Sequence, residues 1–288
     1  MKYAFIQDHR EQFRVKRLCE VLEVSRSGYY EWCGRPESPR SCEDRRLGEQ
    51  IKASHEKSRQ TYGTRRIQRD LTEEGEQVSR ARIGRLMRRQ GLEAKARRRF
   101  KATTDSRHTL PVADNHLNRN FEVKEPDRVY VGDITYIPTA EGWLYLAVLI
   151  DLYSRMVVGW AMSARMTADL VGDALKMAIG KRRPPKELMV HHDRGSQYAS
   201  HRYRQTLDEH QYVLSMSRKG NCWDNAPAES FFKTLKTELV HGAQFQSRDQ
   251  AKQEIFEYIE VFYNRRRRHS SIEYQAPANY DAQHSKPA

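Results

Sequence analysis

The sequence has few cysteines and no long apolar run, and these shortages exclude several classes of protein. Its four cysteines, Cys19, Cys33, Cys42 and Cys222, form no C-x-x-C pair and have no histidine at zinc-finger spacing, which argues against a zinc site or a disulfide framework. No stretch approaches the roughly 18 apolar residues of a membrane span, and the N-terminus lacks the apolar centre of a signal peptide. We expect reduced thiols, no membrane association and a cytoplasmic location.

Acidic residues are scarce in the N-terminal part of the chain. The formal net charge is +13 over 288 residues. Residues 1–110 hold 27 Lys and Arg against 16 Asp and Glu, an excess of 11, so an excess of only 2 remains for residues 111–288. Concentrated positive charge favours a polyanionic partner, because neutralised phosphates release counterions. The alternative is a soluble basic surface without a partner. With a DNA partner the protein would be nucleoid-associated.

Helical patterns occupy this basic part. Residues 11–33 read as two short helices, the shape of a helix-turn-helix, although any small helical hairpin looks similar. A polar linker with two prolines follows at 34–43. Three further helices are predicted: one that includes Ile51, one over TRRIQRDL, and one that begins after the N-cap Ser79 and closes at Gly91.

The last of these helices is rich in arginine. Ile83, Leu86 and Met87 form its apolar stripe. The rest of its surface carries Arg80, Arg82, Arg85, Arg88 and Arg89. This distribution is typical of a recognition helix in a DNA groove; the alternative is a solvated helix whose arginines keep it soluble. The basic segment 95–101 either follows phosphates or merely links domains.

From residue 128 the periodicity becomes that of strands. RVYVGDITYI alternates between two faces, and WLYLAVLIDLY and MVVGWAM follow after short links, which predicts an antiparallel meander. A helix over 167–179, the strand ELMVHHD, the helix YASHRYRQTLDEH and the short strand YVLSM come next. Helices over 224–240 and 248–264 follow. We predict a mixed α/β domain with a central five-stranded sheet.

Three acidic residues lie in three different elements of this domain. Asp133 is inside the first strand on an otherwise apolar face, where an ionised carboxylate is costly unless it is paired or bound to a cation. Asp193 ends the fourth strand, at a carboxyl edge where ligands commonly bind. Glu229 lies on a later helix, one turn after Asn225 and two turns before Lys236, so these three side chains can face the same way.

Such a carboxylate set suits hard divalent cations. Mg²⁺ or Mn²⁺ is preferred, and a pair of ions about 4 Å apart can activate water and stabilise a leaving 3′ oxygen. This is phosphodiester chemistry. Lys236 could then hold the phosphate of a DNA end, or it is an ordinary surface lysine.

Three blocks of sequence, GDITYI, HHDRGSQY and NAPAESFFKTLK, resemble the signature blocks of the OrfB transposases of the IS-three family of insertion sequences. Fifty-nine residues separate Asp133 from Asp193 and 35 separate Asp193 from Glu229, which matches the DD35E spacing that this family shares with retroviral integrases. YGTRRI and the arginine-rich helix resemble the family's helix-turn-helix segment, and RSGYYEW resembles its N-terminal start. The likeness covers nearly the whole chain.

The resemblance implies an RNase H-like catalytic core. Asp133, Asp193 and Glu229 would be catalytic metal ligands for two Mg²⁺ or Mn²⁺ ions, and Lys236 would contact the DNA end, with Asn225 and the five arginines as further predicted DNA contacts. It implies a transposase that cleaves transposon ends and joins the 3′-OH to target DNA without a covalent enzyme intermediate. The implied partners are double-stranded DNA, further copies of the chain on DNA, and an upstream OrfA protein fused by frameshifting.

These observations predict five segments. A small helical segment occupies 1–36, a helix-turn-helix module 43–100, a linker 101–124, the RNase H-like core 125–240, and a C-terminal helix with a basic tail 241–288. Two rival functions are a non-catalytic DNA-binding protein and an RNase H-type nuclease that acts on RNA–DNA hybrids. Intact acids at all three positions argue against the first, and the basic N-terminal modules argue weakly against the second.

Several other residues have two readings. His191 and His192 could ligate metal, although supporting a metal ligand or packing in the core fits their alternation better. Tyr198 and Trp223 either stack on a flipped base or pack against the fold. Asp151 suits a salt bridge or a turn better than a metal. The run 265–268 either binds the DNA backbone or is a solvated stretch after a helix.

Overall fold

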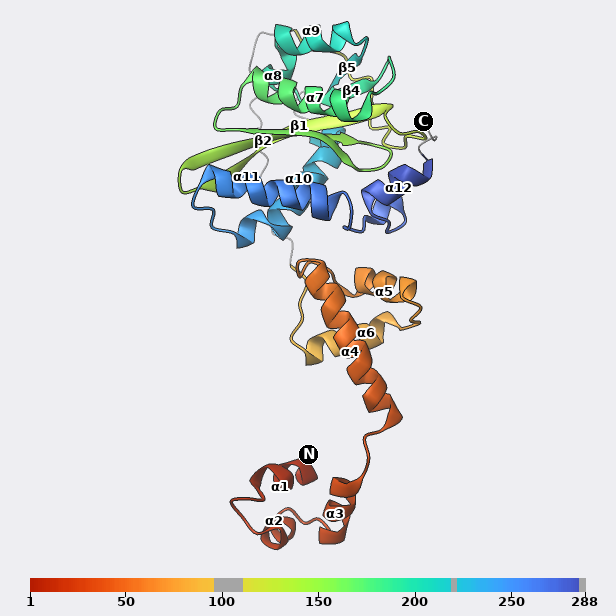
Figure 1. Cartoon of the computed structure of the whole chain (residues 1–288), viewed down its shortest axis with the longest axis vertical. Helices are drawn as coiled ribbons and strands as arrows, with labels where there is room; N and C mark the ends of the chain where they lie inside the picture. The colour runs from red at the N-terminus through yellow and green to blue at the C-terminus, as the bar shows by residue number, and fades with distance from the viewer. Residues whose placement is uncertain (96–110, 219–221, 285–288) are drawn as a thin grey trace. The chain divides into compact units, whose positions relative to one another are not determined.

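The computed structural model of the chain describes residues 1–95, 111–218 and 222–284. It divides into two compact units, Met1–Ile51 and Lys52–Ala288, and Figure 1 labels the elements of both. Within the described residues, no helix is long and apolar enough to span a membrane. Most of the predicted basic segment 95–101 lies outside the described residues.

The first unit is built from short helices. They are α1 (Lys2–His9), α2 (Val15–Val21), α3 (Arg26–Gly34) and the first part of α4 (Pro39–Lys57). Ile6, Cys19 and Tyr29 form its small core, and the side chain of Ser25 caps α3 by accepting a hydrogen bond from the Gly28 amide. The pair α2 and α3 confirms the two helices predicted over 11–33.

The second unit begins with a helical pair that follows the end of α4. Helix α5 (Thr64–Glu73) buries Ile67 and Leu71, and α6 (Arg80–Arg89) buries Ile83, Leu86 and Met87. The Ser79 side chain accepts a hydrogen bond from the Arg82 amide at 3.2 Å, and Gly91 has a φ of +65° just beyond the helix. Both predicted ends of α6 are therefore confirmed.

A five-stranded sheet forms the centre of the second unit. Its strands are β1 (Val129–Thr139), β2 (Gly142–Asp151), β3 (Val157–Ser163), β4 (Met189–His192) and β5 (Val213–Met216), in the order β3-β2-β1-β4-β5. The first three strands are antiparallel, whereas β4 and β5 run parallel to β1. This is the RNase H-like arrangement, and it confirms the predicted mixed sheet.

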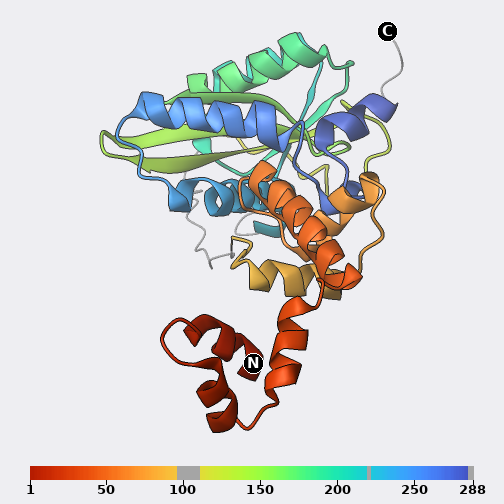
Figure 2. The ribbon, with the colours of Figure 1, turned by 60° about the horizontal axis from the view of Figure 1, so that its bottom comes forward.

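Helices cover both faces of this sheet. One face packs against α7 (Ala168–Arg182), α8 (Ser196–Ala199) and α9 (His201–Glu209), through a core that includes Leu149, Val158 and Leu175. The other carries α10 (Ala226–Glu238), which contacts β1, and α11 (Arg248–Phe256), which contacts β2. Figures 1 and 2 show α11 in blue alongside the sheet.

Short elements connect and complete these layers. The 3-10 helix η1 (Cys222–Asn225) leads into α10, and η2 (Val240–Gly242) follows it. Helix α11 continues as one π-helical stretch, η3 (Glu257–Tyr263), and the 3-10 turn η4 (Ser270–Ile272) precedes α12 (Pro277–His284). The C-terminal part thus contains the predicted helix over 248–264 and a further short helix that the sequence pattern did not reveal.

Candidate active site

Strand β1 places Asp133 at an edge that β4 leaves open. The pairing between β1 and β4 covers only Val129 to Val131, so the next backbone groups of β1 need other partners. One of them, the Gly132 carbonyl, accepts a hydrogen bond of 3.1 Å from Asn225 Nδ2. Asp133 is half-buried just after this point, and its Oδ1 accepts a hydrogen bond from the Ile134 amide at 2.8 Å.

Gly132 is required here because His192 packs onto it. A Cβ at position 132 would lie 2.6 Å from His192 Cε1, which no ordinary side chain allows. The His192 ring stacks on Tyr198, with centroids 3.8 Å apart, and its Nε2 shares a hydrogen bond of 2.7 Å with the Tyr203 hydroxyl. The stack holds the end of β4 against β1, next to Asp193.

Asp193 follows β4 and opens the turn into α8. Its Oδ1 accepts a hydrogen bond of 2.9 Å from the Gly195 amide, a local bond typical of aspartate at a turn. The side chain is half-buried. Asp193 thus lies at the carboxyl end of the fourth strand, as the sequence predicted, and this strand runs parallel to β1.

Glu229 enters the site from the first turn of α10. Pro227 lies in that turn, where its missing N–H costs nothing. Asn225, immediately before the helix, is 3% exposed, and its bond to Gly132 ties the start of α10 to β1. The structure therefore places Asn225 inside the protein, at the edge of the strand. Glu229 itself is exposed.

The three carboxylates influence one another's proton affinity. Burial raises the pKa of Asp133 well above its ordinary value, and the negative charges of Asp193 and Glu229 raise it further, against the bond from Ile134 and the charge of Lys236. Partial burial raises the pKa of Glu229, and Asp193 adds to that rise. Three segments that are far apart in sequence thus bring their acids within electrostatic reach.

Among the described residues, no group of three or more His, Cys, Asp or Glu side chains is arranged to hold a metal ion. One oxygen each of Asp133 and Asp193 accepts a backbone N–H. Their repulsion is what a divalent cation between them would relieve, and carboxylate oxygens are the donors that Mg²⁺ and Mn²⁺ prefer.

Lys236 reaches back toward β1 from the last turn of α10. Its Nζ lies 4.8 Å from the centre of the Tyr136 ring, a cation–π distance. Burial lowers the pKa of Lys236, whereas Tyr136 and Asp133 raise it. The lysine predicted to contact the DNA end therefore lies near Asp133, on the same helix as Glu229.

A buried aspartate beside the site escaped the sequence reasoning. Asp224 is fully buried in η1 and accepts hydrogen bonds from Asn115, from Arg119, and from both the amide and the guanidinium of Arg218. The Arg218 guanidinium is the main reason why the pKa of Asp224 lies well below its usual range. The hydrogen bonds of Asp224 thus connect three segments of the chain just before α10. The sequence showed only that an acid lies directly before Asn225. It did not reveal which residues would bind that acid.

The arginine-rich surface of α6 is exposed, as predicted. Arg80, Arg85, Arg88 and Arg89 are exposed, and Arg82 is half-buried. The Arg88 Nε donates to the Gly84 carbonyl at 3.3 Å. These side chains surround the apolar stripe that faces α5 and leave a basic outer face on the helix.

The residues with two readings have structural roles. Burial lowers the pKa of His191 to about 4, and its ring nitrogens share hydrogen bonds with the hydroxyls of Ser215 and Ser217. Tyr198 is buried under His192. Asp151 accepts hydrogen bonds from the Ser154 amide and hydroxyl, which confirms the predicted turn role.

Trp223, unlike His191 and Tyr198, is not buried in the fold. It is 69% exposed, in η1 directly before Asp224, so its ring is accessible beside the site. The side chain of Cys222 lies outside what the structure describes.

The arginine run 265–268 behaves differently from either reading. Arg267 is 4% exposed, and its Nε and Nη2 donate to the Glu238 carboxylate at 2.9 and 2.8 Å. Arg268 donates to Asp70 at 2.5 Å and to Glu73 at 2.6 Å. Half of the run is therefore neither solvated nor directed at DNA. The acids that bind it lie far away in the sequence, so the charge run alone gave the wrong interpretation.

Models of known families match three stretches of the chain. A model described as an integrase core domain matches residues 123–222, a second model of the same description matches 229–284, and an HTH-like domain matches 42–100. The first integrase match contains Asp133 and Asp193, and the second begins at Glu229.

Curated relatives match the chain over nearly its full length. Transposase InsF for insertion sequence IS3A from Escherichia coli (strain K12) is 46% identical over 272 residues, 94% of each chain. An uncharacterized 31 kDa protein of insertion element IS600 from Shigella sonnei is 49% identical over 263 residues, 91% of this chain and 97% of that protein. Among solved structures, the HTLV-2 integrase catalytic core domain in complex with magnesium is 15% identical; the match covers 55% of this chain and 97% of that one, with a TM-score of 0.43.

Proposed function

Since the chain belongs to the IS3 family of insertion-sequence transposases, we propose that its catalytic centre is formed by Asp133, Asp193 and Glu229. The chain is a transposase that acts in DNA transposition and integration. The proposed reaction is hydrolysis at a transposon end, which frees a 3′-OH, followed by attack of that hydroxyl on a phosphate of target DNA. One bond to phosphorus forms as another breaks in each step.

One observation carries this assignment. Burial raises the pKa of Asp133 in β1, and the charges of Asp193 after β4 and Glu229 in α10 raise it further, although ordinary folding favours separating like charges. Strongly perturbed carboxylates in one place are typical of catalytic sites. The alternative, a protein that only binds DNA, gives no reason to collect two further acids beside the half-buried Asp133.

The donor set fits Mg²⁺ or Mn²⁺, and the three carboxylates would hold it, with two ions per site. When bound, the metal supplies an activated water and charge stabilisation for the leaving 3′ oxygen. The protein's own groups position the DNA: Lys236 binds a phosphate near the cleaved bond as a point charge. Asn225 keeps the first turn of α10, and with it Glu229, at the edge of β1.

The remaining parts of the chain would handle recognition and assembly. We propose residues 43–100 as a DNA-binding module, with the exposed arginines of α6 on the duplex, and 125–240 as the catalytic core. Simultaneous action on two transposon ends calls for at least two copies on DNA. A fusion to the upstream OrfA protein would add specific end recognition.

The test is cleavage and joining of a labelled duplex that carries the element's own end. Wild type and Glu229→Gln are compared in Mg²⁺ and in Mn²⁺, each alone and fused to the upstream protein. The expected result is cutting and joining by the wild type and a loss of at least about 1,000-fold for Glu229→Gln, equivalent to about 4 kcal/mol of transition-state stabilisation. DNA binding should persist.

Glu209→Gln is the matched control, because Glu209 is an exposed acid at the end of α9. It should retain full activity. A Glu229→Gln chain as active as the wild type would refute the catalytic assignment. An RNA–DNA hybrid, offered beside the duplex, separates a transposase from an RNase H-type nuclease, which would cut the hybrid and join nothing.

A further inference from the structure

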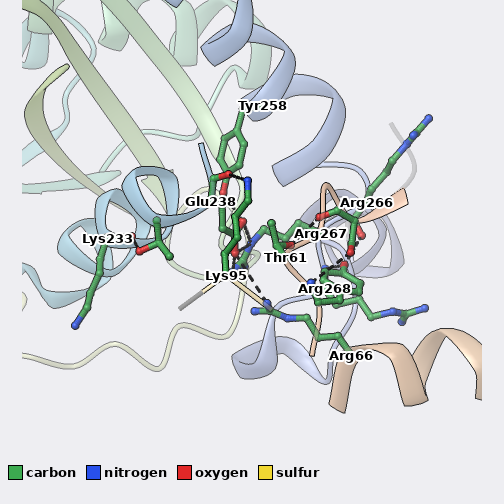
Figure 3. A network of polar contacts seen from close by, with 12 residues as sticks. Thr61, Arg66, Lys95, Lys233, Glu238, Tyr258, Arg266, Arg267 and Arg268 are labelled. Carbon is green, nitrogen blue, oxygen red and sulfur yellow. Dashed lines mark hydrogen bonds and ion pairs between the residues drawn. The ribbon is translucent and has the colours of Figure 1, made fainter. Parts of the chain in front are cut away.

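Charged side chains connect residues 62–95 to the C-terminal part of the second unit (Figure 3). We call this set the latch. On one side it contains Tyr62, Arg66, Asp70, Glu73 and Lys95, and on the other Glu238, Arg267 and Arg268.

The first half of the latch centres on Glu238, at the C-terminal end of α10. Its carboxylate accepts hydrogen bonds from Arg267 and from the Tyr258 hydroxyl at 2.7 Å, and Arg66 of α5 approaches to 3.9 Å. Its backbone carbonyl accepts a hydrogen bond of 2.8 Å from Lys95 Nζ. The Arg267 and Glu238 side chains are only 4% and 8% exposed, so water screens this pair little.

The second half centres on Arg268. Its guanidinium binds Asp70 and Glu73, which lie one turn apart on α5, and also the Tyr274 carbonyl. Its backbone amide donates to the Tyr62 hydroxyl at 2.7 Å, and the same hydroxyl donates to the Arg266 carbonyl. Arg268 thus connects α5 to the C-terminal segment.

The arginine face of α6 remains outside the latch. The bonds come from α5, from Tyr62 before it and from Lys95 beyond α6, while Arg80 and Arg88 stay exposed on α6. On the other side, Glu238 shares its helix with Glu229, nine residues away, which is about 13 Å along the helix axis. The latch therefore joins the helical pair that carries the basic face to the helix that carries the catalytic glutamate.

We propose that the latch sets where the transposase cuts. With α5 and α6 held against the catalytic core, the distance along the duplex between the DNA bound by α6 and the phosphate at the carboxylates is fixed, so one position is cleaved. Arg268 is then a specificity-determining residue that touches no reacting atom. This inference rests on the proposed function, because it needs both the DNA contact of α6 and the carboxylate site.

The experiment maps cut positions at single-nucleotide resolution on the labelled end duplex, with the full chain fused to the upstream protein. Arg268→Ala is compared with Arg266→Ala, which removes the same charge from an exposed side chain that points away from the latch in Figure 3. We expect wild type and Arg266→Ala to cut at one position. Arg268→Ala should spread its cuts over neighbouring phosphates and lower the ratio of main to other cuts at least about fivefold, a typical coupling between two sites.

Two further variants keep the test decisive. Glu73→Gln weakens the same contact from an acid that is 68% exposed, in case Arg268→Ala fails to fold. Arg268→Lys, which keeps a positive charge beside Asp70 and Glu73, should keep a single position. A purely structural role for Arg268 would lower activity without moving the cuts.

An Arg268→Ala chain that cuts at the wild-type position only would overturn the proposal. If the wild type cuts nothing, the proposed function fails, and hydrogen exchange of residues 62–73 then tests the latch by itself. Faster exchange in Arg268→Ala than in Arg266→Ala would support the latch, and equal exchange would overturn it.

Discussion

Helix α10 carries a glutamate near each end, and the fold treats them in opposite ways. Glu229 is exposed beside two other acids, its pKa is raised, and no ion pair reaches it from the described residues. Glu238 is buried and accepts hydrogen bonds from Arg267 and Tyr258. Charge that the fold leaves unbalanced indicates a place for a ligand. Charge that the fold balances in its interior becomes costly when one partner is removed.

The largest expected effect is on the stability of the second unit, and it distinguishes the Glu238 end of α10 from the Glu229 end. Arg267→Ala leaves Glu238 buried without its main partner, so the second unit should lose about 3–5 kcal/mol in its free energy of unfolding. Urea denaturation followed by tryptophan fluorescence measures this. Glu229→Gln should not lower that free energy. An equal loss of stability in Arg267→Ala and Glu229→Gln would contradict the difference proposed between the two ends of α10.

The next largest effect is on DNA binding by Lys236, which lies on the same helix as Glu229. Lys236→Ala should weaken binding of an end duplex about tenfold, and the slope of log K against log salt should fall by about 0.9 for one lost phosphate contact. Fluorescence anisotropy at several salt concentrations gives both values. Lys233→Ala is the matched control, since Lys233 is exposed on the same helix; a loss as large as that of Lys236→Ala would argue against a specific contact.

A smaller effect should appear in metal-free protein. The raised pKa of Asp133 means that the folded state holds this proton more tightly than the unfolded chain, so stability falls as pH rises above the ordinary value of an aspartate. Asp133→Asn removes that cost and should raise the melting temperature at pH 8 by a few degrees. Added Mg²⁺ should raise it for wild type only. A lower melting temperature for Asp133→Asn would contradict the electrostatic reading.

The smallest effect lies next to the latch. Burial, with the charges of Arg267, Arg155 and Arg66, lowers the pKa of His269 to about 3. The unfolded chain therefore binds this proton first, and its stabilising contribution, complete above about pH 6.5, should be lost progressively as pH falls toward about 3. His269→Gln should flatten this part of the curve of stability against pH, and an unchanged curve would show that His269 does not contribute.

The sequence predicted the parts of the site that depend on local pattern. Alternation along β1 and the end of the fourth strand located Asp133 and Asp193, and the helical spacing located Glu229 and Lys236. The antiparallel arrangement of β1, β2 and β3 followed from the short links between them. These features need only neighbouring residues to define them.

The parts that the sequence did not reveal depend on partners far away in the chain. Asp224 looked like an ordinary acid until Arg119 and Arg218 were seen around it. The run that contains Arg267 and Arg268 suited either DNA binding or solvation, yet their partners Glu238 and Asp70 lie about 30 and 200 residues earlier in the chain. A charge in a sequence does not state which opposite charge it will meet.

Metal binding tests the contrast between the two glutamates most directly. Calorimetric titration of Mn²⁺ into the full-length wild type, Glu229→Gln and Glu238→Gln, each shown to be folded at the temperature used, compares the two ends of one helix. We expect Glu238→Gln to bind Mn²⁺ like the wild type and Glu229→Gln to bind at least about tenfold more weakly. Equal affinity in the wild type and Glu229→Gln, or a loss confined to Glu238→Gln, would contradict the account.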